Sequence, residues 1–154
     1  MAIIKAVSSK ASIGKAIDYV EKKEKTEEKL LEGIECNPST AAIEMEAVKK
    51  AWGKEDGRQY KHFVYSFPPG EKVSLEQIRD NARKLVEETK AFKGHQVLIA
   101  VHNDREHKHA HIIVNSVNAE DGHKLQWSKA DLKSIKERCN ELSRSQGLSV
   151  PEKS

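Results

Sequence analysis

The sequence predicts an α/β (α+β) fold with a central, antiparallel-leaning sheet and helices packed on it. Two observations support this class. Apolar or β-branched segments of strand length alternate with capped amphipathic helices, and the last two such segments are joined by a short polar connection, as in a β-hairpin. A chain of 154 residues suits one compact domain, so we expect a single domain over residues 1–154.

The expected strands are rich in apolar, aromatic and β-branched side chains. They cover residues 2–7, 62–67, 96–102 and 110–117, and residues 103–108 form the hairpin connection between the last two. Pro68, Pro69 and Gly70 stop the second strand. Residues 21–29 are almost wholly charged, and we expect a solvated helix end or a loop there.

Four helices are predicted where a polar capping residue precedes apolar side chains at helical spacing. They begin after Ser12, Asn37, Ser74 and Ser128, and the last three are expected to end near Trp52, Gly94 and Gly147. Pro38 suits the first helical position. Gln77 and Asp131 stand three residues after their capping serines, which is the capping-box spacing.

Net charge, cysteine content and the length of the apolar runs indicate where the protein is found and how it could bind nucleic acid. The net charge is +3, from 27 basic and 24 acidic residues, so any basic surface for nucleic acid must be made by folding. Cys36 and Cys139 are far apart in the chain and are expected to be reduced thiols. No signal peptide and no apolar run of about 18 residues is present, so we expect a cytoplasmic protein that does not enter the membrane.

Four of the seven histidines fall within ten residues, between His102 and His111. His109 and His111 are two apart in a strand, so their imidazoles point to the same face. A hairpin would bring His102 beside them, and three imidazoles on one face form a metal site with positions open for substrate. The alternatives are an inert surface tract, a structural zinc site and an adventitious binder.

Two further residues of this segment are candidates. His107 shares the parity of His109 and His111, and is interpreted as a fourth ligand, an outer-shell group or a phosphate contact. Asp104 could orient an imidazole or act as a general base, or it could be an ordinary turn residue.

The pattern His102-x-Asp104-x-x-His107-x-His109-x-His111-Ile-Ile-Val-Asn115 resembles the histidine motif of relaxases of plasmids and integrative elements. These are HUH endonucleases, and the resemblance is to a MobA/MobL-like N-terminal relaxase domain. Residues 62–71 resemble the second motif of the family, in which a serine, here Ser66, contacts DNA beside the nick. Residues 16–20 resemble the first motif, which carries the nucleophilic tyrosine, here Tyr19.

The resemblance implies site- and strand-specific DNA nicking at a transfer origin, for conjugative transfer or mobilisation. Tyr19 would attack the scissile phosphodiester and become joined to the 5′ phosphate. Mn²⁺ or Mg²⁺ is the expected ion, with Zn²⁺ and Ni²⁺ as alternatives because imidazole binds them well. The expected partner is single-stranded or hairpin DNA, and accessory DNA-binding mobilisation proteins are further candidate partners. Because relaxases are often longer, the chain could be an excised N-terminal domain.

Several aromatic, histidine and asparagine residues lie outside these motifs. Tyr65 is expected to pack in the core, whereas Tyr60 could stack on a base. His95 and His123 are expected at the surface, and the role of His62 stays open. Asn115 could hold a loop or contact DNA.

Three other functions compete with the relaxase interpretation. A rolling-circle replication initiator or a transposase of the same superfamily usually carries its tyrosine after the histidines, and no tyrosine follows His111. A non-cleaving DNA-binding accessory module would have no need of Tyr19 and the three histidines. An unrelated metallohydrolase would use water as its nucleophile and form no covalent adduct.

Overall fold

The computed structural model of the chain describes residues 3–7, 12–22, 28–103 and 107–149. Its strands are β1 (Ile3–Val7), β2 (Glu28–Ile34), β3 (Tyr60–Ser66), β4 (Val97–Asn103) and β5 (Lys108–Asn115). Its helices are α1 (Ile13–Lys22), α2 (Ala41–Ala51), α3 (Leu75–Glu87) and α4 (Lys129–Ser145), with short 3-10 turns η1 (Pro38–Thr40) and η2 (Lys90–Phe92).

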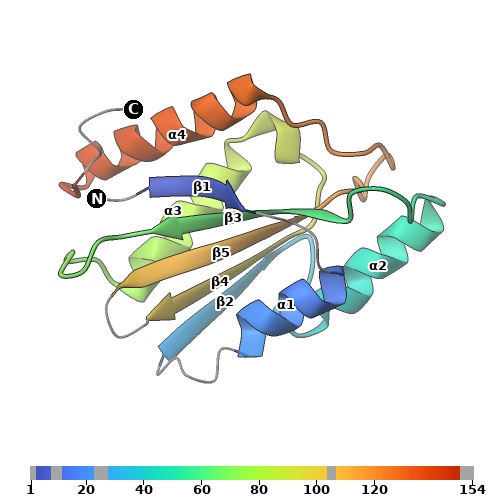
Figure 1. Ribbon diagram of the computed structural model, residues 1–154, viewed down its shortest axis with the longest axis horizontal. Helices are drawn as coiled ribbons and strands as arrows, with labels where there is room; N and C mark the ends of the chain where they lie inside the picture. The colour runs from blue at the N-terminus through green and yellow to red at the C-terminus, as the bar shows by residue number, and fades with distance from the viewer. Residues whose placement is uncertain (1–2, 8–11, 23–27, 104–106, 150–154) are drawn as a thin grey trace.

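The five strands form one sheet in the order β1-β3-β5-β4-β2, and every neighbouring pair is antiparallel. β4 and β5 are the predicted hairpin, and they occupy the middle of the sheet beside β3 (Figure 1). The predicted α/β class with an antiparallel sheet is therefore confirmed.

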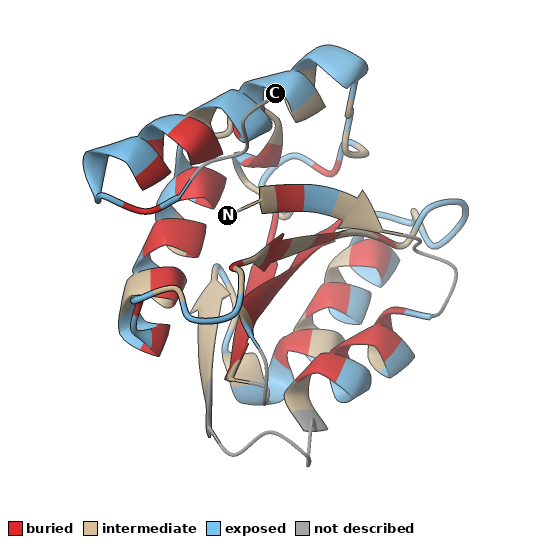
Figure 2. Cartoon of the chain, turned by 60° about the vertical axis from the view of Figure 1, so that its left-hand side comes forward, coloured by how far each residue is buried: buried red, intermediate tan, exposed pale blue. Residues whose placement is uncertain are grey.

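Helices cover both faces of the sheet (Figure 2), and the side chains of the central strands pack alternately against the helices on one face and on the other. Val97, Ile99 and Val101 of β4 pack with α3 and α4 in the larger core. Leu98 and Ala100 of the same strand pack with α1 and α2 in the smaller core. This alternation is the period-two pattern of a strand buried on both faces, and it places His102 on the α1 side.

Ser12, Ser74 and Ser128 precede the helices that they were predicted to begin, whereas Asn37 caps the short turn η1 and α2 begins only at Ala41. Ser74 Oγ accepts a hydrogen bond from the backbone N–H of Gln77 at 3.0 Å, and Ser128 and Asp131 form a complete capping box. α3 ends at Glu87 rather than at Gly94, because η2 intervenes. Gly94 has a positive φ of 83°, and a Cβ there would lie 2.6 Å from the Asn118 side chain, so the turn requires glycine.

The segment of residues 21–29 was predicted wrongly in part. β2 begins at Glu28 and continues to Ile34, where it pairs with β4 at the edge of the sheet. A charged edge strand is common in natural sheets because charge discourages pairing with another chain. The charge of residues 21–29 concealed the start of this strand.

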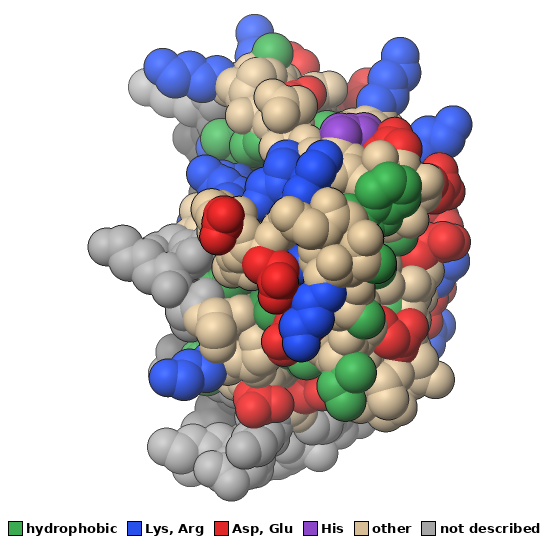
Figure 3. Space-filling model, turned by 90° about the vertical axis from the view of Figure 1, so that its right-hand side faces the viewer, with side chains coloured by type: hydrophobic (Ala, Val, Ile, Leu, Met, Phe, Trp, Pro, Cys, Tyr) green, Lys and Arg blue, Asp and Glu red, His purple; other side chains and the backbone are tan. Residues whose placement is uncertain are grey.

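The surface carries the charge mixture that the sequence predicts. On the side of the molecule shown in Figure 3, Lys and Arg side chains are interspersed with Asp and Glu. None of the described helices combines the length and the apolar composition that are needed to cross a bilayer.

A buried lysine stabilises the end of β5. Lys49 of α2 is buried, and its Nζ donates a hydrogen bond of 2.5 Å to Asn115 Oδ1. Asn115 Nδ2 donates to the Met45 carbonyl and to Gln96 Oε1 at 3.2 and 3.0 Å. Asn115 therefore ties α2 to the sheet, which is the structural one of the two predicted roles. Burial lowers the pKa of Lys49 to about 8.

The unfolding free energy is expected to depend on Lys49 above neutral pH. The folded pKa lies below the unfolded value, so between pH 8 and 10 the unfolded chain binds more protons and stability rises with pH. Relative to the variant Lys49→Met, the wild type should gain about 1 kcal/mol between about pH 7 and pH 9. Urea unfolding at both pH values measures this gain. The comparison cancels the opposite contributions of Cys36 and Cys139, whose thiol pKa values burial raises. An unchanged difference between the two proteins would contradict the prediction.

Candidate metal and tyrosine site

Three buried histidines meet on the α1 side of the β4–β5 hairpin. His102 lies directly opposite His109 in the strand register, and His111 follows two residues later on the same face. The ring centroids are 5.3 Å apart for His102 and His109, 5.1 Å for His102 and His111, and 4.9 Å for His109 and His111. The strand parity that the sequence suggested does bring these side chains together.

The triad fits a divalent cation. One ligand nitrogen of each histidine lies within 4.8 Å of the other two. Imidazole nitrogens that share an ion at about 2.1 Å stand roughly 3–4 Å apart, so small side-chain rotations would complete the site. Three neutral nitrogen donors would leave the full charge of the ion for an anionic substrate.

His102 is also held by the first helix. Its Nε2 donates a hydrogen bond of 2.6 Å to the backbone carbonyl of Val20 in α1. This bond places the proton on Nε2 of the neutral ring, so the lone pair for an ion is on Nδ1. Val20 directly follows Tyr19, and the same helix therefore carries Tyr19 and orients a histidine of the triad.

His62 of β3 is a fourth histidine at the site, and its role had been left open by the sequence. Its Nε2 lies 2.9 Å from Nδ1 of His111. Burial lowers the pKa of His62 to about 4, so the ring is neutral near pH 7. A neutral His62 can accept the Nδ1 proton of His111 and thereby direct His111 Nε2 toward an ion. This contact depends on the register in which β3 pairs with β5, and that register could not be predicted from the sequence.

Tyr19 lies beside the triad and is exposed. Its side chain is 60% accessible, and its ring centroid is 6.1 Å from that of His111. Tyr65 is buried in the core, as predicted, and its hydroxyl accepts a hydrogen bond from Asn81. Tyr60 is 2% exposed and packs in the smaller core, so the prediction that it could stack on a base is wrong. Tyr19 is thus the tyrosine that a substrate at the triad can reach.

The remaining candidates lie around this face. Ser66 is half-buried at the end of β3 and is the register partner of His109. His107 is exposed, with its ring centroid 5.7 Å from that of His109. Asp104 lies outside the described residues. Ser66 and His107 are therefore within reach of a substrate at the triad.

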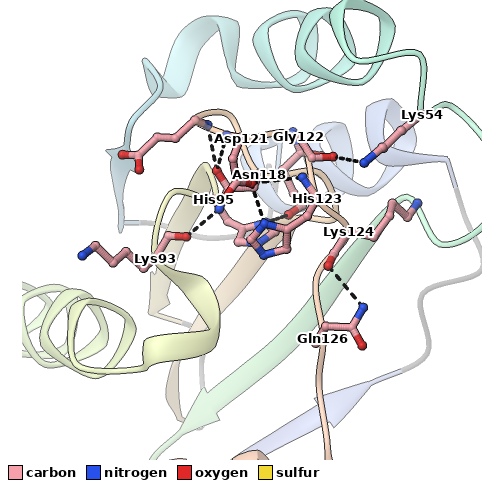
Figure 4. Close-up of polar contacts among 11 residues, drawn as sticks. Lys54, Lys93, His95, Asn118, Asp121, Gly122, His123, Lys124 and Gln126 are labelled. Atoms are coloured by element: carbon pink, nitrogen blue, oxygen red, sulfur yellow. Dashed lines mark hydrogen bonds and ion pairs between the residues drawn. The ribbon is translucent and has the colours of Figure 1, made fainter.

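The other two histidines belong to the opposite end of β5. His95 Nδ1 donates a hydrogen bond of 2.7 Å to the Asn115 carbonyl, and the side chain is 1% exposed, so the predicted surface position is wrong. Packing of the turn over residues 118–124 buries it, as Figure 4 shows. His123 is exposed, as predicted, and its Nδ1 lies 2.5 Å from Asp121 Oδ1.

A sheet that carries three histidines on one face, with a helix tyrosine beside them, is the arrangement that the resemblance to relaxases predicts. A family model described as "Relaxase: MobA/VirD2-like, nuclease domain" matches residues 19–148. The chain belongs to this family. The predicted relationship to relaxases is confirmed.

Individual relatives agree with this assignment. The chain is 38% identical over 143 residues to "Protein rlx" of Staphylococcus aureus, which covers 93% of this chain and 42% of the relative. It is 40% identical over 68 residues to the "Group II intron-interrupted relaxase LtrB" of Lactococcus lactis, which covers 43% of this chain and 12% of that protein. The chain therefore spans less than half the length of these curated relatives.

A solved structure shares the fold. It comes from work on the "Molecular Basis of Vancomycin Resistance Transfer in Staphylococcus aureus" and aligns with a TM-score of 0.63. The alignment covers 97% of this chain and 95% of the other, at 13% identity. The arrangement of sheet and helices is therefore one that is already known.

Proposed function

We propose that this chain is the nicking domain of a relaxase and cuts one DNA strand at a transfer origin, with Tyr19 as the nucleophile. The observation that carries the proposal is the position of Tyr19: it is exposed, and its ring lies 6.1 Å from that of His111 in the triad. The family supports DNA as the substrate. Mobilisation or conjugative transfer is the process that such a nick would serve.

The reaction is a transesterification at phosphorus. The Tyr19 oxygen forms a bond to phosphorus, the bond from phosphorus to the 3′ oxygen breaks, and the phenol proton is given up as the 3′ oxygen gains one. The 5′ phosphate stays on Tyr19, and the phosphodiester energy is kept for rejoining the strand. A divalent cation, held by His102, His109 and His111, would supply positive charge to the phosphate oxygens.

The residues around the triad have positioning roles in this proposal. The hydrogen bond from His102 to Val20 holds α1 close to the site, and the phenol is carried on that helix. His62 orients His111. Ser66 and His107 are proposed DNA contacts, and Asp104 is the proposed acid–base group. Mn²⁺ or Mg²⁺ is the proposed ion, because phosphoryl chemistry depends on ion availability as well as on affinity.

The test is a search for the covalent product. A pool of single-stranded oligonucleotides labelled at the 3′ end is incubated with the protein and Mn²⁺ and then denatured. We expect label on a protein band that survives denaturation, and mass spectrometry should place the adduct on the peptide that contains Tyr19. Cleaved DNA without any labelled protein would instead indicate water as the nucleophile, as in a metallohydrolase.

A further inference from the structure

A groove lies at the edge of the sheet, between β1 and α4. Its volume is about 520 Å³, and it is lined by apolar residues such as Ile4 and Leu132 together with several lysines. Figure 1 shows α4 lying alongside β1, which is an edge strand. The groove is separate from the triad, which lies on the other side of the sheet with α1.

The charge of the groove is predominantly positive. Lys129, Lys133 and Lys136 of α4 line it, with Lys5 of the edge strand β1 at its rim, against one carboxylate, that of Glu137. All four lysines are exposed, and none makes an ion pair with a residue in the described part of the chain. Unpaired ammonium groups of this kind are suited to neutralise phosphates.

The lysines of α4 are also spaced for a phosphate backbone. Lys129, Lys133 and Lys136 follow the spacing i, i+4, i+7, so they share one stripe of the helix. The stripe is about 10 Å long at 1.5 Å per residue, which corresponds to the rise of about three base pairs along the axis of a duplex. By contrast, Arg138 on a neighbouring part of the helix pairs with Glu88 at 2.6 Å.

The strand register connects the groove to the nicking face. Ile3 is the partner of Ser66, and Ser66 is the partner of His109. Two strand spacings, about 10 Å, therefore separate the groove from the triad along the sheet. Lys5 lies opposite Val64, so its side chain points to the triad face. DNA that crosses the sheet from the triad toward β1 would reach the groove at the edge.

We propose that the β1–α4 groove binds the phosphate backbone of duplex DNA next to the nicked strand. This inference rests on the proposed function for its biological context. The lining residues include no aromatic or arginine side chain, so unpaired bases would find no stacking platform, whereas a duplex can be held through its phosphates without one. Lysines neutralise phosphates without reading sequence, so the contact adds affinity and orientation but no sequence specificity.

The test compares charge-matched variants. The groove variant is Lys129→Gln, Lys133→Gln, Lys136→Gln. The control variant is Lys84→Gln, Lys90→Gln, Lys93→Gln, which replaces three exposed lysines on α3, on η2 and directly after η2. Fluorescence anisotropy is measured with a labelled mixed-sequence duplex of about 20 base pairs and with oligo(dT) of equal length. The groove variant should bind the duplex about tenfold more weakly near 100 mM salt, with a salt slope smaller by about 2 to 3. Its oligo(dT) affinity should change less than about twofold, and the control variant should bind both probes nearly as the parent does.

Two outcomes would contradict the proposal that the groove binds duplex DNA. Duplex affinity equal to that of the control variant would do so, and so would an equal loss for duplex and oligo(dT), which would place single-stranded DNA there. The adduct assay separates this proposal from the proposed function. A groove variant that forms the adduct but has lost duplex affinity supports both proposals. If the parent forms no adduct while the groove variant loses duplex affinity, duplex binding by the groove is supported and the proposed nicking function is contradicted.

Discussion

Tyr19→Phe is expected to abolish nicking and adduct formation together, by about a thousandfold or more, because it removes the attacking oxygen. The fold should be unchanged, since the side chain is 60% exposed and the substitution removes one oxygen. Binding of uncut DNA and of metal should persist for the same reason. Denaturing electrophoresis with labelled DNA, followed by circular dichroism of the same sample, measures both parts of the prediction.

The matched controls are the other two tyrosines of the chain. Tyr60→Phe and Tyr65→Phe remove the same oxygen from buried positions on β3, where no substrate reaches it. Both variants should still form the adduct, although Tyr65→Phe loses the hydrogen bond from Asn81 and should be slightly less stable. If Tyr19→Phe still formed the adduct and one of the controls did not, the nucleophile would be the tyrosine replaced in that control and not Tyr19.

The clustering of the three histidines could be predicted from the sequence because it depends on one local geometry. Alternation along β5 puts His109 and His111 on one face, and the short connection forces β4 to return beside β5. Only the register remained to be known, and the structure places His102 directly opposite His109. Helix starts were equally local, since Ser74 and Ser128 cap through residues three positions away.

Features that depend on distant segments could not be predicted in this way. His62 contacts His111 only because β3 pairs with β5 in one register, and nothing near His62 in the sequence indicates that register. His95 is buried by the turn over residues 118–124, more than twenty residues away. Tyr60 is covered by α1 and α2. In each case tertiary packing determined the exposure of a residue whose local sequence looks polar.

Replacement of His109 and His111 by Ala is expected to abolish binding of a divalent cation to the triad. The double variant leaves one imidazole, so affinity for Mn²⁺ should fall by more than about a hundredfold, beyond the loss that follows from removing an outer-shell partner alone. Isothermal titration calorimetry of the metal-free protein measures the stoichiometry and the affinity directly, without any need for cognate DNA. Nicking should be lost as well.

The control is His123→Ala, which removes an exposed imidazole at the opposite end of β5. It should keep the stoichiometry and affinity of the parent, because His123 lies at the end of β5 that is opposite to the triad. Circular dichroism checks that the double variant is folded, since two buried side chains are shortened in it. A folded double variant with unchanged stoichiometry and affinity would show that the cation is not bound by the triad. The nicking proposal would then have to account for the phosphate charge by protein groups alone.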